Sequence, residues 1–189
     1  RLVRFVLPER PPVWLSGVTR GTIAVEPGAS GLDANVAFEL ENPNLTRPVV
    51  TAGGGVEWQS IWTDQRVTAA AKASYRSEGQ QLELHSLTLA ATGITIDAAG
   101  TVDRLTTTAD AVLNGTLRYE LASLRQQFAS VLPGDLAVSG SGQKPFAVRG
   151  SLVSLVDGLA ARAGLGWDQL ELWGLAIGKG EISATLDRQ

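Results

Sequence analysis

The chain of 189 residues contains no cysteine, no methionine and only one histidine. Without cysteine it can form neither disulfides nor thiolate metal sites, and it has no cysteine nucleophile. Its net charge is −3, and it lacks the clustered Lys and Arg that bind nucleic acid or anionic headgroups. No apolar run reaches the roughly 18–20 residues that cross a bilayer, so we expect any membrane-anchoring segment to lie outside the given residues.

Signatures of catalysis and of metal or cofactor binding are also missing. We interpret His85 as a solvated strand residue, because no nucleophile and orienting acid accompany it at a known spacing. The glycines at 53–55 precede no phosphate-binding lysine, and no Gly-x-Ser-x-Gly elbow occurs. The scattered carboxylates lack calcium-loop spacing. We therefore predict that the protein is not an enzyme and has no catalytic residue, no metal and no cofactor.

Long stretches of alternating apolar and polar residues dominate the chain. In the clearest example, apolar or glycine residues occupy every second position from 94 to 102 and again from 109 to 121, on either side of a polar turn at 104–108. Successive side chains of a strand point to opposite faces, so this alternation is typical of half-buried strands. We predict a mainly β fold in which long amphipathic antiparallel strands form a curved or folded-over sheet with an apolar inner face.

The same alternation predicts further strands at 22–26, 34–41, 56–63, 66–76 and 80–90. In the last of these the apolar phase slips by one residue at His85-Ser86, which predicts a β-bulge. We expect Asn42-Pro43-Asn44 to end the second strand, because proline cannot donate to a strand ladder. Later in the chain we predict a hairpin of 136–138 with 146–152 and a closing pair of strands at 170–175 and 181–186.

Two segments have the apolar spacing of short helices, namely 121–132, which Pro133-Gly134 would stop, and 151–163. We treat 1–189 as a single β-rich domain or as a fragment of a larger repetitive β protein, with a proline-rich lead-in segment at 1–12. A weak internal repeat supports the second possibility. The stretches LELHSLTLAATGITIDAAGTVDRL and LELWGLAIGKGEISATLDRQ both place a Leu-Glu-Leu strand before a strand that ends in Asp-Arg.

The stretch from about residue 63 to residue 152 resembles bacterial AsmA-like proteins of the Gram-negative envelope. The residues that carry the resemblance are LELHSLTLAATGITIDAAGTVDRL, ADAVLNGTLRYELASL and the Gly-rich GSGQKPFAVRGSL. The family repeats a similar phrase, in which an alternating strand and a short turn precede a strand ending in Gly-Thr/Ser-Val-Asp. A shorter segment, VAFELENPNLTRPVV, resembles the strand–Asn-Pro-Asn–strand phrase of late-embryogenesis-abundant β-sandwiches.

The AsmA-like resemblance implies an elongated, folded-over sheet with an apolar trough. It implies a location in the periplasm, with a tether to the inner membrane through an N-terminal helix. It also implies a part in phospholipid transport toward the outer membrane and in outer-membrane biogenesis. The chain departs from the family pattern because it has no membrane helix and few repeats.

Our leading hypothesis is a non-enzymatic periplasmic or envelope module that binds or transfers lipid by holding acyl chains in an apolar β-trough. Its partner would be a phospholipid or another acyl-chain ligand, with envelope proteins as further possible partners and no nucleic acid. Small residues such as Ala71 and Gly115 would leave the space that acyl chains fill. The predicted lipid-binding residues are Val36, Phe38, Leu40, Trp58, Trp62, Tyr75, Ile94, Ile96, Val102, Leu113, Leu117 and Tyr119.

Two alternatives stay open. The first is a structural β-sandwich or scaffold module that fills its own apolar face and mediates protein–protein interaction in the envelope. The second is a hydrolase, which rests only on scattered acids and His85. The tryptophans leave a similar choice, because they either fill the core and the sheet ends or, in the case of Trp58 and Trp62, line a trough.

Overall fold

The computed structural model describes residues 3–5, 13–28, 31–51, 53–134, 136–151, 153, 159–172 and 174–186. The described chain forms a large sheet of eleven strands, a small sheet of three strands and one helix, so the mainly β, antiparallel fold is confirmed. The strands of the large sheet are β1 (Val3–Phe5), β2 (Val13–Gly28), β3 (Gly31–Val50), β4 (Val56–Thr63), β5 (Arg66–Arg76), β6 (Gln81–Ala91), β7 (Ile94–Asp103), β8 (Asp110–Glu120), β10 (Ser141–Ser151), β11 (Leu159–Trp167) and β14 (Gly180–Leu186). The remaining elements are α1 (Leu121–Gln127) and the small-sheet strands β9 (Ala137–Ser139), β12 (Gln169–Leu172) and β13 (Leu175–Ile177).

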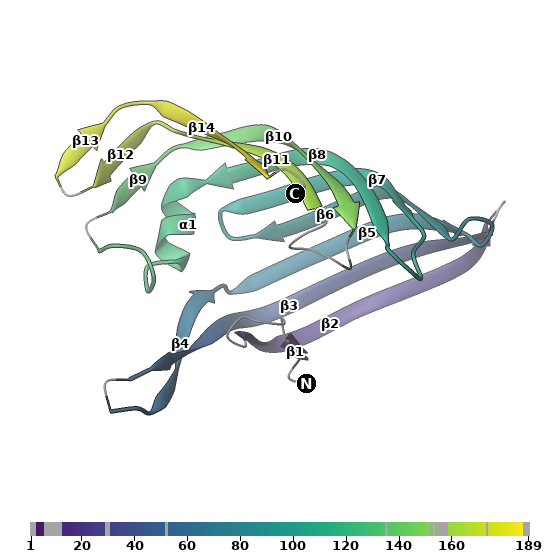
Figure 1. Cartoon of the computed structure of the whole chain (residues 1–189), viewed down its shortest axis with the longest axis horizontal. Helices are drawn as coiled ribbons and strands as arrows, with labels where there is room; N and C mark the ends of the chain where they lie inside the picture. Colours follow the sequence, from purple (N-terminus) through teal and green to yellow (C-terminus); the bar gives the residue numbers. More distant parts are fainter. Residues whose placement is uncertain are drawn as a thin grey trace.

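Ten strands of the large sheet lie in the order β1-β2-β3-β5-β6-β7-β8-β10-β11-β14, and β4 pairs with β3 beside this path. Tight turns join β5 to β6 and β6 to β7, where Gly79 and Gly93 adopt the positive φ that glycine tolerates best. Figure 1 shows that the sheet is strongly curved, with β2 and β3 on one side and β10, β11 and β14 on the other. Helix α1 lies at one end of this curve, near β4 and β9 (Figure 1).

The register of the strands gives the large sheet two chemically different faces. Residues paired across antiparallel strands point to the same side of a sheet. On the side that we call the apolar face, one row of paired residues runs from β2 to β10 as Ile23, Val36, Ala71, Leu87, Ala98, Gly115 and Phe146. On the side that we call the polar face, a neighbouring row is Arg20, Glu39, Thr68, Ala90, Thr95, Arg118 and Gln143. The alternation seen in the sequence therefore holds in register across the whole width of these strands.

The predicted β-bulge in β6 is confirmed. The register of β6 against β7 shifts between Leu84 and Leu87. The register against β5 shifts at the same place, between Lys72 and Ala73. The bulge adds one residue to β6, and this extra residue switches the face on which the following side chains lie. Leu82 and Leu84 therefore lie on the same face as Leu87 and Leu89.

The expectation that Asn42-Pro43-Asn44 ends a strand is wrong. Strand β3 continues through these residues to Val50, and it exchanges its partner there from β5 to β4. Asn42 takes a left-handed φ of 48°, which asparagine tolerates better than most residues. Pro43 is fully buried, and its carbonyl accepts from the backbone N–H of Asp64. The missing proline N–H falls at the point where the ladder changes partner, so no strand pairing is lost.

The second predicted helix, 151–163, is wrong. Ser151 ends β10 and Leu159 to Ala163 form the first half of β11, while residues 152 and 154–158 lie outside the described part of the chain. The free edge of β10 gives Leu159 a partner in Gly150, and this pairing overrides a helical pattern of apolar residues. The first predicted helix, 121–132, is present but shorter, since α1 ends at Gln127 and turns follow.

The predicted pairings late in the chain are also wrong. Strand β9 pairs with β12 rather than with β10, and β10 pairs with β8 over its whole length. The expected closing pair does not form, because β12 pairs with β13 and β14 pairs with β11. The two Leu-Glu-Leu stretches therefore lie in different sheets and do not form equivalent hairpins.

Gly115 is a point where the sheet has no room for a side chain. A Cβ atom there would lie 2.0 Å from the carbonyl oxygen of Asp97 and 2.7 Å from the ring of Phe146. We expect Gly115→Ala to lower the free energy of unfolding by about 1–3 kcal/mol, measured by urea denaturation. Gly53→Ala is the matched control, because a Cβ at Gly53 meets no atom within 4 Å. Equal stability of the two variants would contradict this account.

Candidate functional site

The candidate site is the apolar face, and it contains ten of the twelve residues predicted to bind lipid. They come from four strands, and the register places them on one side. These residues are Val36, Phe38 and Leu40 of β3, Tyr75 of β5, Ile94, Ile96 and Val102 of β7, and Leu113, Leu117 and Tyr119 of β8. The sequence pattern therefore predicted most of the residues that share this face.

Burial on the apolar face falls steeply from the middle of the sheet to its β2 side. Val102 of β7 and Tyr119 of β8 are each only 5% exposed, and Ala111 packs against Val102 in the small buried core. By contrast, Phe38 of β3 is 43% exposed and Ile23 of β2 is 64% exposed. The chain thus covers the centre of this face with its own side chains and leaves the part on β2 and β3 open to solvent.

Trp58 and Trp62 lie apart from these ten residues on β4, which pairs with β3 beside the main path of the sheet. The ring of Trp58 stands edge-on to that of Trp14, with centroids 5.5 Å apart and an interplanar angle of 89°. The indole N–H of Trp62 donates to Oε1 of Gln127 in α1 at 2.9 Å. These contacts join β4 to β2 and to α1 at one end of the sheet, while Trp58 stays 47% exposed.

Asp64, in the turn between β4 and β5, ties α1 to the large sheet. Its carboxylate accepts from the amide of Gln127 at 2.9 Å, from the hydroxyl of Thr92 at 2.7 Å and from the backbone N–H of Thr92 at 2.8 Å. The backbone N–H groups of Gln65 and Arg66 donate to it as well. Burial raises the pKa of Asp64, but the hydrogen bonds from Thr92, Arg66 and Gln65 outweigh burial and hold this pKa below its usual value.

Sequence reasoning missed Asp64. Its local signal is a carboxylate that accepts from the next two backbone N–H groups, an arrangement typical of turns. Its contacts with Thr92 and Gln127 join residues 28 and 63 positions away, and no spacing rule predicts them.

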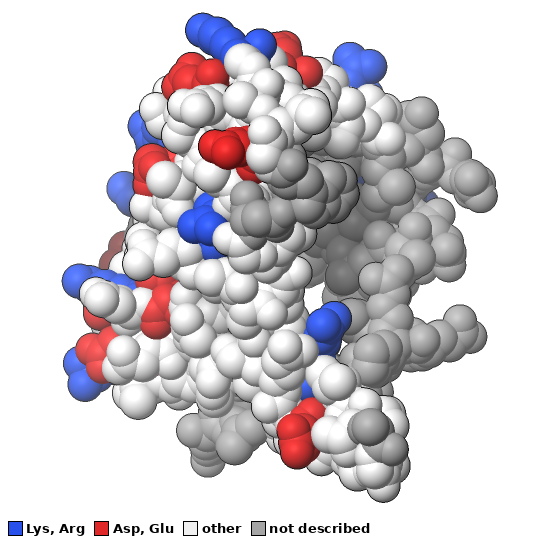
Figure 2. Space-filling model, turned by 90° about the vertical axis from the view of Figure 1, so that its left-hand side faces the viewer, with Lys and Arg blue, Asp and Glu red and all other residues white. Residues whose placement is uncertain are grey.

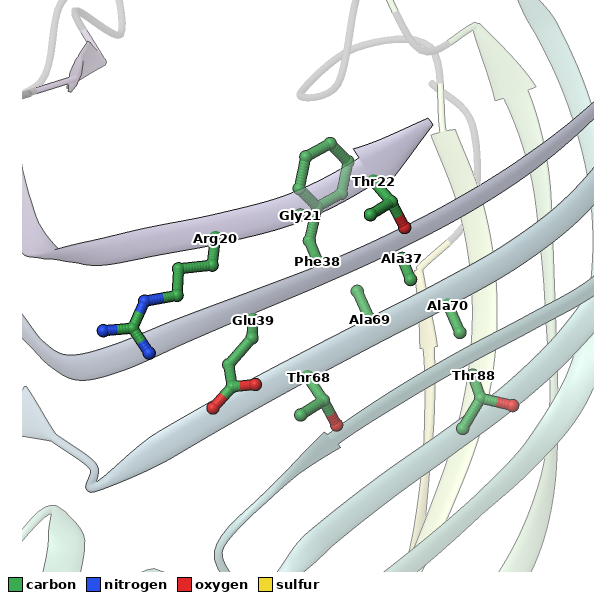
Figure 3. Close-up of a pocket in the computed structure, with 10 residues that line it drawn as sticks. All are labelled: Arg20, Gly21, Thr22, Ala37, Phe38, Glu39, Thr68, Ala69, Ala70 and Thr88. Atoms are coloured by element: carbon green, nitrogen blue, oxygen red, sulfur yellow. The ribbon is translucent and has the colours of Figure 1, made fainter. Parts of the chain in front are cut away.

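The polar face has a shallow hollow that the sequence did not reveal. Its volume is about 470 Å³, and Figure 3 shows Arg20 and Glu39 at one end of it and Thr88 at the other. Ala37 and Ala70 leave the space, because their side chains are much shorter than their neighbours. A second hollow of about 320 Å³ shares these two alanines and extends toward Lys72. Phe38 also lines the first hollow and Val36 the second, so each hollow touches one of the predicted lipid-binding residues.

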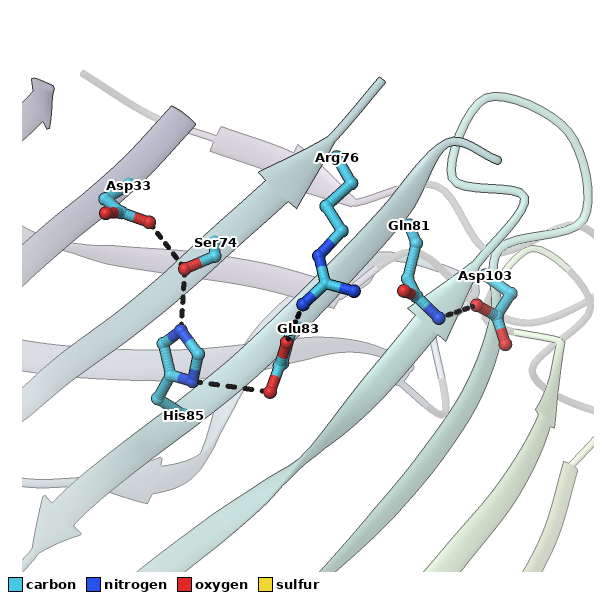
Figure 4. Close-up of polar contacts among 7 residues, drawn as sticks. All are labelled: Asp33, Ser74, Arg76, Gln81, Glu83, His85 and Asp103. Atoms are coloured by element: carbon cyan, nitrogen blue, oxygen red, sulfur yellow. Dashed lines mark hydrogen bonds and ion pairs between the residues drawn. The ribbon is translucent and has the colours of Figure 1, made fainter. Parts of the chain in front are cut away.

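His85 has partners that sequence reasoning did not identify (Figure 4). Its Nε2 atom lies 2.7 Å from Oγ of Ser74, and its Nδ1 atom lies 3.7 Å from a carboxylate oxygen of Glu83. However, the hydroxyl of Ser74 donates to Asp33 at 2.5 Å, so its proton points away from the imidazole. A nucleophilic serine must give its proton to the histidine. The group is exposed on the polar face and has the arrangement of a solvated network across β3, β5 and β6.

The polar face also carries ion pairs that cross neighbouring strands. Arg20 pairs with Glu41 and Arg66 with Glu39, each at 2.8 Å, and Arg76 pairs with Glu83 at 3.0 Å. Such exposed pairs each contribute about 0–1 kcal/mol. Their main consequence is a face that water solvates well, in contrast to the opposite side of the same sheet.

Within the part of the chain that the structure describes, no three His, Cys, Asp or Glu side chains come close enough to hold a metal ion. The described residues also include no helix with the length and apolarity needed to cross a membrane. Comparisons with protein-family models, curated proteins and solved structures gave no match. The AsmA-like resemblance therefore stays a prediction from the sequence.

We expect Asp64→Asn to lower the free energy of unfolding by about 1–3 kcal/mol at pH 7, because an amide group would face the N–H of Thr92. Since the pKa of Asp64 is lowered in the folded protein, its carboxylate stabilises the fold above the unfolded pKa of about 3.9. This stabilisation is lost as the pH falls through the lower folded pKa. The difference between wild type and variant should therefore shrink below about pH 4.

Urea denaturation at a series of pH values measures this difference. Asp168→Asn is the matched control, because Asp168 is exposed and its substitution should leave the stability within about 0.5 kcal/mol of wild type. A stability loss for Asp64→Asn that stays constant down to pH 2 would contradict the assigned role of the carboxylate.

Proposed function

We propose that the protein is a non-enzymatic lipid-binding module whose apolar face lines the inside of the curved sheet and holds acyl chains. The observation that carries the proposal is that a continuous apolar face, formed in register from β2 to β10, is only partly covered by the chain itself. The AsmA-like resemblance supports a place in the periplasm or cell envelope. Phospholipid is the ligand class that such a surface and such a location favour.

The total accessible surface supports an uncovered face. The chain exposes 12335 Å², whereas a compact monomer of 19.9 kDa is expected to expose roughly 8,700 Å². The excess is far larger than surface roughness explains. An excess of this kind supports a sheet that stays an open single layer over part of its area.

The distribution of charge supports the same arrangement. In Figure 2 most charged side chains lie along the left side of the molecule and around its upper rim, an uncharged area covers much of the middle, and a few charged groups lie at the lower right. In the register, the row from Ile23 to Phe146 on the apolar face contains no charged residue, so an apolar ligand there would meet few charges. A surface that excludes water and offers few hydrogen-bonding groups suits a hydrocarbon chain better than a polar ligand.

The magnitude of apolar burial is sufficient for lipid binding without a specific headgroup contact. Each buried methylene contributes about 0.8 kcal/mol. A 16-carbon chain that buries half of its surface on the open part of the face would gain roughly 6 kcal/mol. Exposed residues such as Phe38 and Ile23 provide large apolar contacts, and small ones such as Ala69 and Ala71 leave room beside them.

The scaffold alternative predicts a different occupant of the same face. A protein partner would cover Phe38 and its neighbours with side chains of its own, and no lipid would be needed. The scaffold alternative also includes a β-sandwich that covers its apolar face with its own side chains. The exposure of Phe38 and Ile23 does not support that arrangement. Identification of what copurifies with the chain separates these cases.

We expect phospholipid to copurify with the wild-type protein, and Phe38→Asp, Ile96→Asp or Leu117→Asp to abolish its binding. Ile96 and Leu117 face each other across β7 and β8, and a carboxylate there would meet hydrocarbon. Phe38 is already 43% exposed, so Phe38→Asp keeps its charge hydrated and should preserve the fold. Native mass spectrometry measures the lipid-bound fraction, and circular dichroism monitors folding.

Thr95→Asp is the matched control for lipid binding. Thr95 pairs with Arg118 on the polar face, so its substitution adds the same charge on the opposite side of β7. This variant should bind lipid as the wild type does. The proposal fails if the wild-type protein carries no lipid and takes up none from phospholipid vesicles, or if Phe38→Asp and Thr95→Asp bind lipid equally well.

The absence of chemistry is part of the proposal and has its own test. We expect His85→Ala and Ser74→Ala to leave lipid binding unchanged and to leave the rate of activated-ester hydrolysis equal to that of the wild type. The physical reason is that the Ser74 hydroxyl donates to Asp33, away from His85. A colorimetric ester assay measures this rate. Loss of hydrolysis in either variant would favour the hydrolase alternative.

A further inference from the structure

The outer edge of β2 is long and apolar. Among the described strands, β1 covers only Val13–Leu15 of this edge, so the stretch from Val18 to Glu26 has no neighbour on that side. Three large apolar side chains in this stretch are exposed, namely Val18 at 54%, Ile23 at 64% and Val25 at 54%. An edge of this kind offers unpaired backbone N–H and C=O groups to a further strand.

The opposite edge of the large sheet is different. Strand β14 has seven residues, whereas β2 has sixteen. Short edge strands are one way in which proteins prevent edge-to-edge pairing, and β2 lacks this protection. Pro27 limits pairing only at the far end of β2, because its missing N–H lies beyond the exposed apolar stretch. If one edge pairs with another strand, the chemistry favours β2.

We propose that β2 pairs antiparallel with β2 of a second copy of the chain, centred on Ile23. This register places Ile23 opposite Ile23 of the second copy, and Gly21 opposite Val25 of the second copy, on the apolar face. On the polar face it places Arg20 opposite Glu26 of the second copy. The two-fold symmetry of the pair repeats each contact, so two Arg–Glu pairs form. This proposal does not depend on lipid binding.

Charge complementarity selects this register from its alternatives. A pair centred on Arg20 or on Glu26 would place like charges directly opposite each other, which destabilises a sheet. A pair centred on Thr22 or on Ala24 would leave Arg20 and Glu26 opposite uncharged residues. A slip by one residue on one strand would join the apolar face of one copy to the polar face of the other. Only the Ile23 register pairs both charges and keeps both faces continuous.

The two charged residues are available for this contact. Glu26 is exposed, and it makes no hydrogen bond or ion pair with any described residue. The guanidinium of Arg20 forms an ion pair at 2.8 Å with Glu41 on β3 of the same copy, yet the Arg20 side chain is 69% exposed. A guanidinium has five N–H donors, so Arg20 can contact a second carboxylate without leaving the first.

Charge reversal tests the register. We expect Glu26→Arg to weaken self-association at least about tenfold in sedimentation velocity, because it creates two Arg–Arg contacts per dimer. Arg20→Glu should weaken it similarly through two Glu–Glu contacts. A one-to-one mixture of the two variants should associate as the wild type does, because every cross-strand contact between unlike copies is then between opposite charges. Arg149→Glu, an exposed change on β10, is the control and should leave association unchanged.

Hydrogen exchange provides a second measurement that does not depend on these variants. The backbone N–H groups of residues 18–26 that point away from β3 should become protected as the protein concentration rises, while those at the free edge of β14 should not. The proposal is overturned if the wild-type protein stays monomeric at high concentration with no such protection. It is also overturned if a dimer forms that protects β14 instead, or if the mixture of variants associates no better than each variant alone.

Discussion

The structure depends on the alternation of apolar and polar residues along strands that pair in register. Because each pair across the ladder shares a face, a single phase error in one strand would mix the two faces for every strand beyond it. The bulge at His85-Ser86 shows how this constraint is met, since one added residue in β6 brings Leu82 and Leu84 into phase with Leu87 and Leu89. The resulting sheet keeps most of its large apolar residues on one side, from Ile23 in β2 to Phe146 in β10.

Local pattern was sufficient to predict most of the strands and the membership of the apolar face. It failed where partner choice decided the outcome. Residues 159–163 have an apolar spacing that suits a helix, but the open edge of β10 accepts them as a strand. Asn42-Pro43 would end an isolated strand, yet two different neighbours, β5 and β4, pair with the segments before and after it. In both places the competing contact lies far away along the chain.

The same reason explains which polar contacts were missed. Asp64 accepts from Thr92 and Gln127, and His85 meets Ser74 and Glu83, through neighbours that only the folded sheet defines. The first group fixes α1 to the end of the sheet, where Trp62 also contacts the helix. The second group lies exposed on the polar face, where the Ser74 hydroxyl donates to Asp33. Composition alone does not show these partners, because the strands that bring them together are distant along the chain.

The uncovered face and the uncovered edge call for different occupants, because their chemistry differs. The face presents side chains such as Phe38 and Ile23 and few hydrogen-bonding groups, so hydrocarbon can cover it at little desolvation cost. The edge of β2 presents backbone N–H and C=O groups, which hydrocarbon would leave unsatisfied and which another strand would pair. Ile23 belongs to both surfaces. Pairing at the edge would therefore bring two partly open apolar faces side by side, and a ligand held on one copy near β2 would lie next to the same surface of the other.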